Sequence, residues 1–120
     1  MIGAQLGTTG AAYAKDNTAA KSVRTYDLID DAFNALEAGQ VDAVINDLPS
    51  TEEAIKGKPD LEIAQDIHTG EAYGFAFNKS NTALLDAWNK QQAAVIQDGT
   101  YAKIYKTWFH KEPPKDFQPS

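Results

Sequence analysis

Hydrophobic residues in the first half of the chain form short apolar runs separated by segments of helical character. The run Ile2–Leu6 is followed by a turn rich in glycine and threonine, and then by the alanine-rich stretch Ala11–Lys15, which has high helix propensity. A second run, Ser22–Tyr26, carries β-branched residues that favour a strand. A third, Asp42–Asp47, is nearly continuously apolar before it ends in two polar residues, which is typical of a strand covered on both faces of a parallel sheet.

Helices are predicted between these strands. Apolar residues recur at helical spacing between Asp27 and Gly39, which predicts a helix over about Leu28–Ala38. Asp27 can cap this helix with its side chain and Gly39 can end it. Pro49 suits the first turn of another helix, which we expect to run to about Lys56. Strand and helix therefore alternate, which predicts an α/β fold with a mostly parallel sheet.

The second half of the chain changes character. We predict two more strands, Leu61–Gln65 and Tyr73–Phe77, and then a long helix that ends at Asp98. A shorter helix follows over Tyr101–Phe109, and we expect residues 110–120, which are rich in proline and polar residues, to form a flexible tail. The aromatic residues of the two helices lie at helical spacing and are most simply explained as core: Trp88, Tyr101, Tyr105 and Trp108.

Composition limits the possible functions. The chain of 120 residues has room for one domain with a modest core. Its net charge of −6, with scattered basic residues, argues against nucleic acid as a partner. It has no cysteine, which excludes disulfides and thiolate chemistry, and no apolar run long enough to cross a membrane. Because Met1 directly precedes a core strand, we expect a leader and a first lobe to have been removed; a chain that starts abruptly is the alternative.

The loop Gly7-Thr8-Thr9-Gly10 is the first candidate for chemistry. It follows a strand and opens a helix, where unpaired N–H groups and the helix dipole favour an anion. The glycines allow a ligand to approach the backbone, and the threonine hydroxyls add donors. The loop therefore suits a carboxylate or a phosphate, although it lacks the lysine of a P-loop; an ordinary strand-to-helix turn is the other interpretation.

Asn46 and Asp47 form the second candidate, at the end of the next predicted parallel strand. A carboxylate there, with no lysine or arginine nearby in sequence, can hold a ligand ammonium through a charge-assisted hydrogen bond. The other interpretation of Asp47 is a cap for the helix after Pro49. Ligands of open α/β sheets bind beyond the carboxyl ends of the strands, so the two loops together outline a pocket for a zwitterion such as an α-amino acid.

No other constellation points to chemistry. His68 and His110 lie far apart and without metal-ligand spacing, so they are best explained as surface residues, and no metal or cofactor is expected. Ser50 and Ser80 lack the surroundings of a nucleophile. We find no catalytic residues and expect no enzymatic activity.

The chain resembles the amino-acid-binding solute receptors of ABC importers, which have the two-lobed periplasmic-binding-protein type II fold. The resemblance runs through IGAQLGTTG, FNALEAGQVDAVINDLP, EAYGFAFNKSN and IQDGTYAKIYKTWF, in the family's order. It implies that residues 1–77 form most of a Rossmann-like, three-layer second lobe together with the returning hinge strand. It also implies that residues 78–109 form helices that pack on the first lobe in a whole receptor, and that much of that lobe is absent.

The resemblance also implies residue roles and partners. Thr8 and Thr9 would bind the ligand α-carboxylate in a turn shaped by Gly7 and Gly10, and Asp47 would bind the α-ammonium. Selectivity would depend partly on two neutral amides, which favour a polar ligand such as glutamine. These two residues are Gln5 and Asn46.

The implied setting is extracytoplasmic, with a free amino acid and the membrane subunits of an ABC importer as partners. The first lobe of a receptor would supply an arginine and aromatic residues that this chain lacks, so we expect weak binding by the chain alone. Without that lobe, Trp88 and Trp108 would expose an apolar face, which predicts self-association or domain swapping.

Three alternatives stay open at this point. The same pocket occurs in effector-sensing domains of transcription regulators and sensor kinases. An enzyme of the same fold would need a general acid or base in the cleft, for which only Asp47 qualifies. The chain could also be a structural fragment with little binding of its own.

Overall fold

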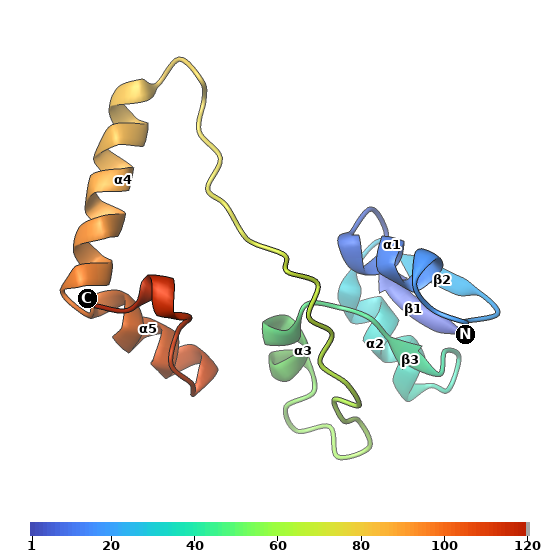
Figure 1. The fold of residues 1–120 in the computed structure, drawn as a ribbon. Helices are drawn as coiled ribbons and strands as arrows, with labels where there is room; N and C mark the ends of the chain where they lie inside the picture. The colour runs from blue at the N-terminus through green and yellow to red at the C-terminus, as the bar shows by residue number, and fades with distance from the viewer. Residues whose placement is uncertain (120) are drawn as a thin grey trace. The chain divides into compact units, whose positions relative to one another are not determined.

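The computed structural model describes residues 1–119, and these fall into two compact units (Figure 1). Unit 1 is Met1–His68 and unit 2 is Thr69–Ser120, of which residues 69–119 are described. Ser120, the last residue of the predicted tail, lies outside the described residues. We describe each unit by itself.

Unit 1 is built on a parallel sheet of three strands in the order β2-β1-β3. The strands are β1 (Ile2–Gln5), β2 (Val23–Tyr26) and β3 (Ala43–Val44). The third strand is shorter than the predicted Asp42–Asp47. Its pairing with β1 nevertheless extends beyond both ends, because the Asp42 N–H donates to Met1 O (2.9 Å) and the Ile45 N–H donates to Gly3 O (3.0 Å).

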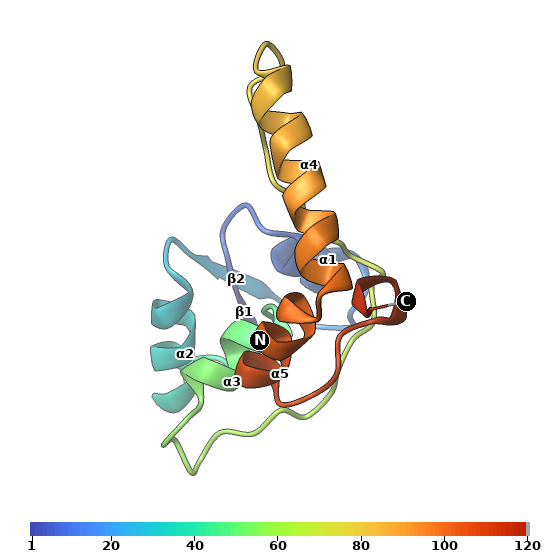
Figure 2. The ribbon, with the colours of Figure 1, turned by 90° about the vertical axis from the view of Figure 1, so that its left-hand side faces the viewer.

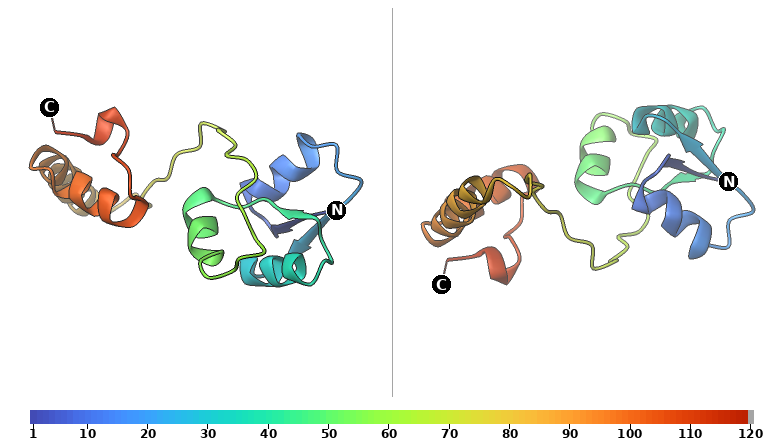
Figure 3. Two further views of the ribbon diagram at one scale, coloured as in Figure 1. Left: turned by 90° about the horizontal axis from the view of Figure 1, so that it is seen from below. Right: turned by 90° about the horizontal axis from the view of Figure 1, so that it is seen from above.

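Three helices accompany this sheet: α1 (Thr9–Asp16), α2 (Ile29–Glu37) and α3 (Leu48–Ala54). Figure 3 shows α1 and α2 on opposite faces of the sheet, so the unit has three layers. This is the result expected when β1-α1-β2 moves outward and β2-α2-β3 returns across β1, both with right-handed crossovers. The predicted α/β fold with a mostly parallel sheet is confirmed.

The core of unit 1 consists mainly of small side chains. Ala4 is fully buried in the central strand and Phe33 of α2 is 3% exposed. Gly3, the residue before Ala4 in β1, has no room for a side chain unless its neighbours shift, since an added Cβ would lie 3.3 Å from Val41 and 3.4 Å from Val44. The buried apolar residues are Ala4, Ala11, Ala14, Ala32, Phe33, Ala35 and Val41.

The ends of α2 confirm one prediction and correct another. Gly39 ends the helix as predicted: it has φ of 68°, and the N–H groups of Gly39 and Gln40 bond back to Leu36 O (3.0 Å) and Ala35 O (2.8 Å). The predicted cap by Asp27 is wrong. Residue 28 occupies the cap position and makes no side-chain cap bond.

The predicted strands Leu61–Gln65 and Tyr73–Phe77 are not formed. The described residues between α3 and α4 contain no strand, and most of them are exposed. A strand exists only where a neighbour pairs with its backbone N–H and C=O groups, and no segment of the described chain pairs with these two. The apolar patterns of these two segments therefore predicted strands wrongly.

Unit 2 contains α4 (Thr82–Gln97) and α5 (Thr100–Phe109), close to the predicted helices. Asn81 caps α4, because its side-chain oxygen accepts from Leu84 N (3.2 Å). Asp98 and Gly99 separate the helices, and Gly99 has φ of 81°. The hydroxyl of Thr100 lowers the pKa of Asp98, and so does its backbone N–H, which donates to the Asp98 carboxylate at 2.8 Å.

The aromatic residues of these helices do not form a buried core, contrary to the simplest interpretation of their spacing. Neither α4 nor α5 has a buried residue. Trp88 is 38% exposed and contacts Phe75 and Phe77, with ring centroids 4.5 and 5.9 Å away, whereas Trp108 is 72% exposed. A two-helix unit has too little surface to enclose large side chains on both helices.

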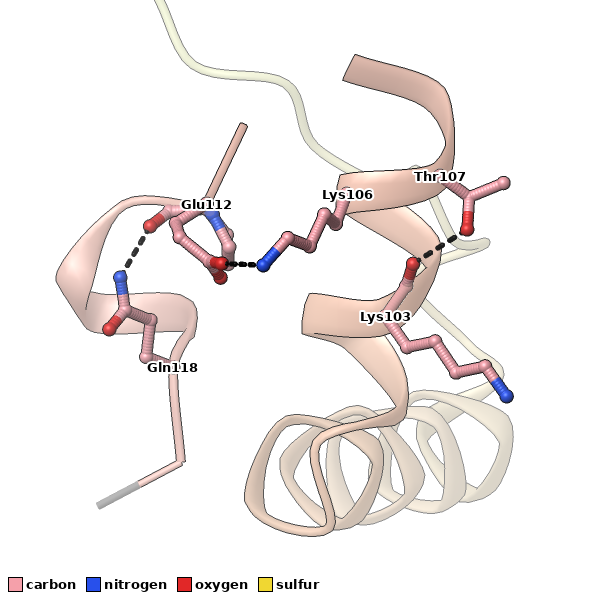
Figure 4. A network of polar contacts seen from close by, with 6 residues as sticks. Lys103, Lys106, Thr107, Glu112 and Gln118 are labelled. Carbon is pink, nitrogen blue, oxygen red and sulfur yellow. Dashed lines mark hydrogen bonds and ion pairs between the residues drawn. The ribbon is translucent and has the colours of Figure 1, made fainter. Parts of the chain in front are cut away.

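The chain after α5, predicted to form a flexible tail, turns back on that helix. A short 3-10 helix, η1 (Lys115–Phe117), lies near the start of α5 (Figure 2), and Phe117 stacks on Tyr101 with 5.4 Å between ring centroids. Pro113 is fully buried. Figure 4 shows the polar contacts that hold this turn, an ion pair between Lys106 and Glu112 and a bond of 2.7 Å from Gln118 Nε2 to Pro113 O.

Replacing Phe33 with alanine should destabilise unit 1 by about 3 kcal/mol, because it removes the one large buried side chain of α2 and leaves a cavity. Hydrogen exchange of the β1 amides measures the free energy of opening. Asn34→Ala, an exposed substitution on the same helix, is the control. If Phe33→Ala lowers the free energy of opening of the β1 amides no more than Asn34→Ala does, the packing of α2 does not stabilise the sheet.

Candidate functional site

The topology of the sheet places the candidate site at one edge. The chain leaves β1 for β2 on one side and then returns to β3 on the other side, so the strand order reverses between β1 and β3. In open parallel sheets, the crevice beyond the carboxyl ends at such a point is where ligands bind. The loops that follow these strands contain the predicted residues Gly7–Gly10 and Asn46–Asp47.

The structure brings the two loops into contact. A Cβ added at Gly10 would lie 3.2 Å from the carbonyl oxygen of Ile45 and 3.5 Å from its side chain. Gly10, predicted as part of a loop, is the second residue of α1. Its missing side chain allows the first turn of α1 to approach the residue that precedes Asn46.

Thr8 has a structural role in the turn. It occupies the cap position of α1, where its Oγ1 accepts from Ala11 N (3.2 Å) and donates to Gln5 O (2.8 Å). A hydroxyl has one hydrogen, so the bond to Gln5 leaves Thr8 none for a ligand oxygen. The Thr8 hydroxyl thus makes the bonds of a helix-capping turn, and its role toward a ligand stays a prediction.

The other predicted residues of the first loop are accessible. Thr9 begins α1 and is exposed, and the N–H groups at the start of a helix have no acceptor within the helix. Gly7 is exposed and has φ of 77°, a left-handed conformation that favours glycine. Gly7 and Thr9 are thus the exposed residues of this turn.

Asp47 takes the cap position of α3 but does not cap it with its side chain. Its backbone carbonyl accepts instead, from Thr51 N (3.0 Å), Ser50 Oγ (3.1 Å) and Thr51 Oγ1 (3.0 Å). The alternative interpretation of Asp47 as a side-chain cap is therefore wrong. Its exposed carboxylate stands at the carboxyl edge of the sheet.

The two amide residues are both held by hydrogen bonds from their nitrogen atoms. Gln5 Nε2 donates to the backbone oxygen of Asp27 (3.1 Å), which ties the end of β1 to the end of β2. Asn46 Nδ2 donates to Ser50 Oγ (2.6 Å) and Thr51 Oγ1 (3.3 Å) in the first turn of α3. The sequence analysis missed Ser50 and Thr51 as supports of Asn46; the only signal was their position just after Asn46-Asp47.

Acidic residues dominate this edge of the sheet. No lysine or arginine occurs in the segments 5–10, 26–31 and 45–51, which follow the three strands. The carboxylates in these segments belong to Asp27, Asp30, Asp31 and Asp47, and all four are exposed. The local charge therefore favours a ligand that carries a cation near Asp47.

Elsewhere, unit 1 has a shallow hollow of about 390 Å³ that is lined by none of the predicted residues. Its lining residues are Asp30, Phe33, Asn34, Ala54 and Lys58. Within residues 1–119, no three acidic or histidine side chains gather as a metal site would require, and no helix is long and apolar enough to cross a membrane.

A profile of the bacterial extracellular solute-binding proteins, family 3, matches residues 11–111. The chain belongs to this family. Among curated members, ABC transporter arginine-binding protein 1 of Escherichia coli is 35% identical over 113 residues, which cover 90% of this chain and 46% of that protein. The ABC transporter glutamine-binding protein GlnH of Bacillus subtilis is 28% identical over 107 residues, or 89% of this chain and 39% of GlnH.

A solved structure shows the same fold. A crystal structure of a mutant of ArgBP from T. maritima superposes with a TM-score of 0.78 at 31% identity, and covers 92% of this chain and 48% of that one. The predicted periplasmic-binding-protein type II fold and the family resemblance are confirmed. The chain spans less than half the length of these relatives.

Replacing Gly10 with alanine should displace the Ile45 carbonyl, because the new Cβ would lie 3.2 Å from it. We expect changed amide chemical shifts at Asn46 and Asp47, whose peptide groups follow Ile45, in two-dimensional NMR spectra. Gly74→Ala is the control, since a Cβ there meets no atom within 4 Å. Unmoved shifts at Asn46 and Asp47 in the Gly10 variant would mean that the two loops adjust independently.

Proposed function

We propose that this chain forms the ligand-binding lobe of an extracytoplasmic amino-acid receptor that delivers its ligand to an ABC importer. The observation that carries the proposal is the meeting of two loops where the strand order reverses, through the close approach of Gly10 to Ile45. One loop presents a helix N-terminus and the other presents a carboxylate. An α-amino acid carries the opposite charge for each of these two groups.

The α-carboxylate is assigned to the first turn of α1. Backbone N–H groups at the start of a helix and the helix dipole both attract an anion. Thr8 fixes the turn through its bonds to Gln5 O and Ala11 N, and Thr9, the first residue of α1, is the second threonine assigned to this carboxylate. Gly7 supplies the left-handed backbone that the turn requires.

The α-ammonium is assigned to Asp47. Its exposed side chain follows β3, at the same edge of the sheet as the α1 turn. A charge-assisted hydrogen bond between ammonium and carboxylate is among the stronger contacts that a partly exposed site can make.

The importer role and the extracytoplasmic location are proposed from the family. Its name describes extracellular solute-binding proteins, and the relatives named above are ABC transporter binding proteins for arginine and glutamine. Another relative is an L-cystine-binding protein of Escherichia coli. All are named for binding rather than for catalysis, which fits a non-enzymatic role. Glutamine remains the prediction from the neutral amides Gln5 and Asn46, with arginine as the competing ligand.

The roles of the two parts are also proposals. We assign residues 1–77 to the second lobe with its hinge segment, and residues 78–109 to helices that cover the first lobe of a whole receptor. The compact units of the structure divide nearby, after His68.

Replacing Asp47 with asparagine should weaken the binding of L-glutamine about tenfold or more, because a charge-assisted bond becomes a neutral one. NMR titration of the isotope-labelled chain measures the affinity even when binding is weak. Asp31→Asn removes a carboxylate from the first turn of α2 and is the matched control. Equal affinity of the Asp47 variant and the unchanged chain would refute the ammonium assignment.

We also propose that the apolar faces of α4 and α5 are covered by a second copy of the chain. Trp108 is 72% exposed and Ile104 is 54% exposed on α5, and Leu84 is 51% exposed on α4. Within unit 2 the rings of Phe75 and Phe77 cover part of Trp88. Large apolar side chains that are exposed to solvent on adjacent helix turns favour association between copies of the chain.

Sedimentation velocity should therefore show a mass that rises with concentration toward that of a dimer. The double substitution Ile104→Ser and Trp108→Ser should restore a monomer, because it removes the most exposed apolar residues of α5. Lys103→Ser, an exposed polar change on the same helix, should leave association unchanged. A single monomeric species at every concentration would refute self-association.

A further inference from the structure

The last described residues, 112–119, form a segment that we call the strap, because it runs back toward the start of α5 (Figure 2). The reversal begins at His110, which ends α5 with φ of 53° and is the one non-glycine residue of positive φ among residues 1–119. This left-handed conformation is costly for a residue with a side chain, and it persists where surrounding contacts hold it. The contacts of the strap are therefore the feature to account for.

The strap is held on α5 from its beginning to its end. Pro113, near the beginning, is fully buried. Phe117 stacks on Tyr101 in the first turn of α5, with 5.4 Å between ring centroids. The end of the strap comes near the residue before α5, since a Cβ added at Gly99 would lie 3.8 Å from Pro119 Cγ.

Apolar contacts rather than charge hold the strap in place. Its ion pair, Lys106 with Glu112, joins side chains that are 63% and 57% exposed, and exposed pairs of this kind contribute little to stability. Gln118 Nε2 donates to Pro113 O (2.7 Å), a bond that lies within the strap and keeps it folded. Burial of Pro113 and the ring contact of Phe117 remove apolar surface from water, which is the larger stabilising contribution.

The strap divides the apolar residues of α5 into a covered row and an open row. Tyr101, Tyr105 and Phe109 recur every four residues and are half-buried, with successive ring centroids 6.1 and 4.5 Å apart. We call these three residues the tyrosine row, and the strap contacts it through the ring stacked on Tyr101. Ile104 and Trp108 lie four residues apart in the neighbouring row and are 54% and 72% exposed.

We infer that the strap is an autoinhibitory contact, which shields the tyrosine row and confines association of the chain to the row of Ile104 and Trp108. The inference rests on the self-association proposed above. Without the strap, the two rows form one continuous apolar face, and a larger exposed face favours association more strongly. The match to the family profile ends at residue 111, so the strap is not among the residues that the profile describes.

Deleting the strap tests this inference. The chain that ends at Lys111 should associate about tenfold more tightly than the full chain in sedimentation velocity, because its tyrosine row is open to a second copy. Association of the shortened chain should also persist when it carries Ile104→Ser and Trp108→Ser, whereas the same double substitution in the full chain should give a monomer. A shortened double variant that is monomeric at every concentration would overturn the inference.

The same measurements separate the strap from the proposals on which it rests. If the full chain is monomeric at every concentration and the shortened chain associates, self-association of the full chain is refuted and the strap is supported. If neither chain associates, both are refuted. Amino-acid binding is tested independently by Asp47→Asn, whose site lies in unit 1.

A point substitution tests the cover without shortening the chain. Phe117→Ala removes the ring that stacks on Tyr101, so the Tyr101 ring should become several-fold more accessible to a dye. Photochemically induced dynamic nuclear polarisation measures this accessibility by NMR. Asp116→Ala, at an exposed residue of the same 3-10 helix, is the matched control and should leave Tyr101 covered. Equal accessibility of Tyr101 in the Phe117 variant and the unchanged chain would show that the strap does not shield this row.

Discussion

The architecture of unit 1 depends on how closely two helices can approach one central strand. Gly3 and Ala4 of β1 carry little or no side chain, and the positions of α1 and α2 that face the sheet are mostly alanine. Small residues allow close packing of helix on sheet, but they bury little apolar area per residue. The sheet is therefore held largely by its backbone ladder and by Phe33, the one large side chain in this core.

The same close approach creates the candidate site. Because α1 packs tightly beside the sheet, its first turn meets the end of β3 at Ile45, and the two loops of opposite electrostatic character lie together. Backbone geometry thus sets where the two loops meet. Side-chain hydrogen bonds add to this arrangement, since the amide of Gln5 donates to Asp27 O and the amide of Asn46 donates to Ser50 and Thr51.

Much of this arrangement could be predicted from the sequence because its signals are local. Helical spacing, Gly39 and Pro49 predicted α2 and α3. The continuous apolar run predicted the parallel strand β3 but was wrong about its burial, since β3 is an outer strand and neither of its residues is buried. The strands expected at residues 61–65 and 73–77 failed because a strand requires a partner, which no local pattern contains. The amide orientations of Gln5 and Asn46 depend on which acceptors other elements bring near, so the sequence could name these residues but not the direction in which they point.

The placement of the aromatic residues has a practical consequence for spectroscopy. Both tryptophans, Trp88 and Trp108, belong to unit 2, and unit 1 contains none. Intrinsic fluorescence therefore reports the environment of α4 and α5, where Trp88 touches Phe75 and Phe77. If an amino acid bound to unit 1 changes the tryptophan emission, its binding must alter the surroundings of a tryptophan in unit 2. An unchanged emission spectrum would not exclude binding of an amino acid to unit 1.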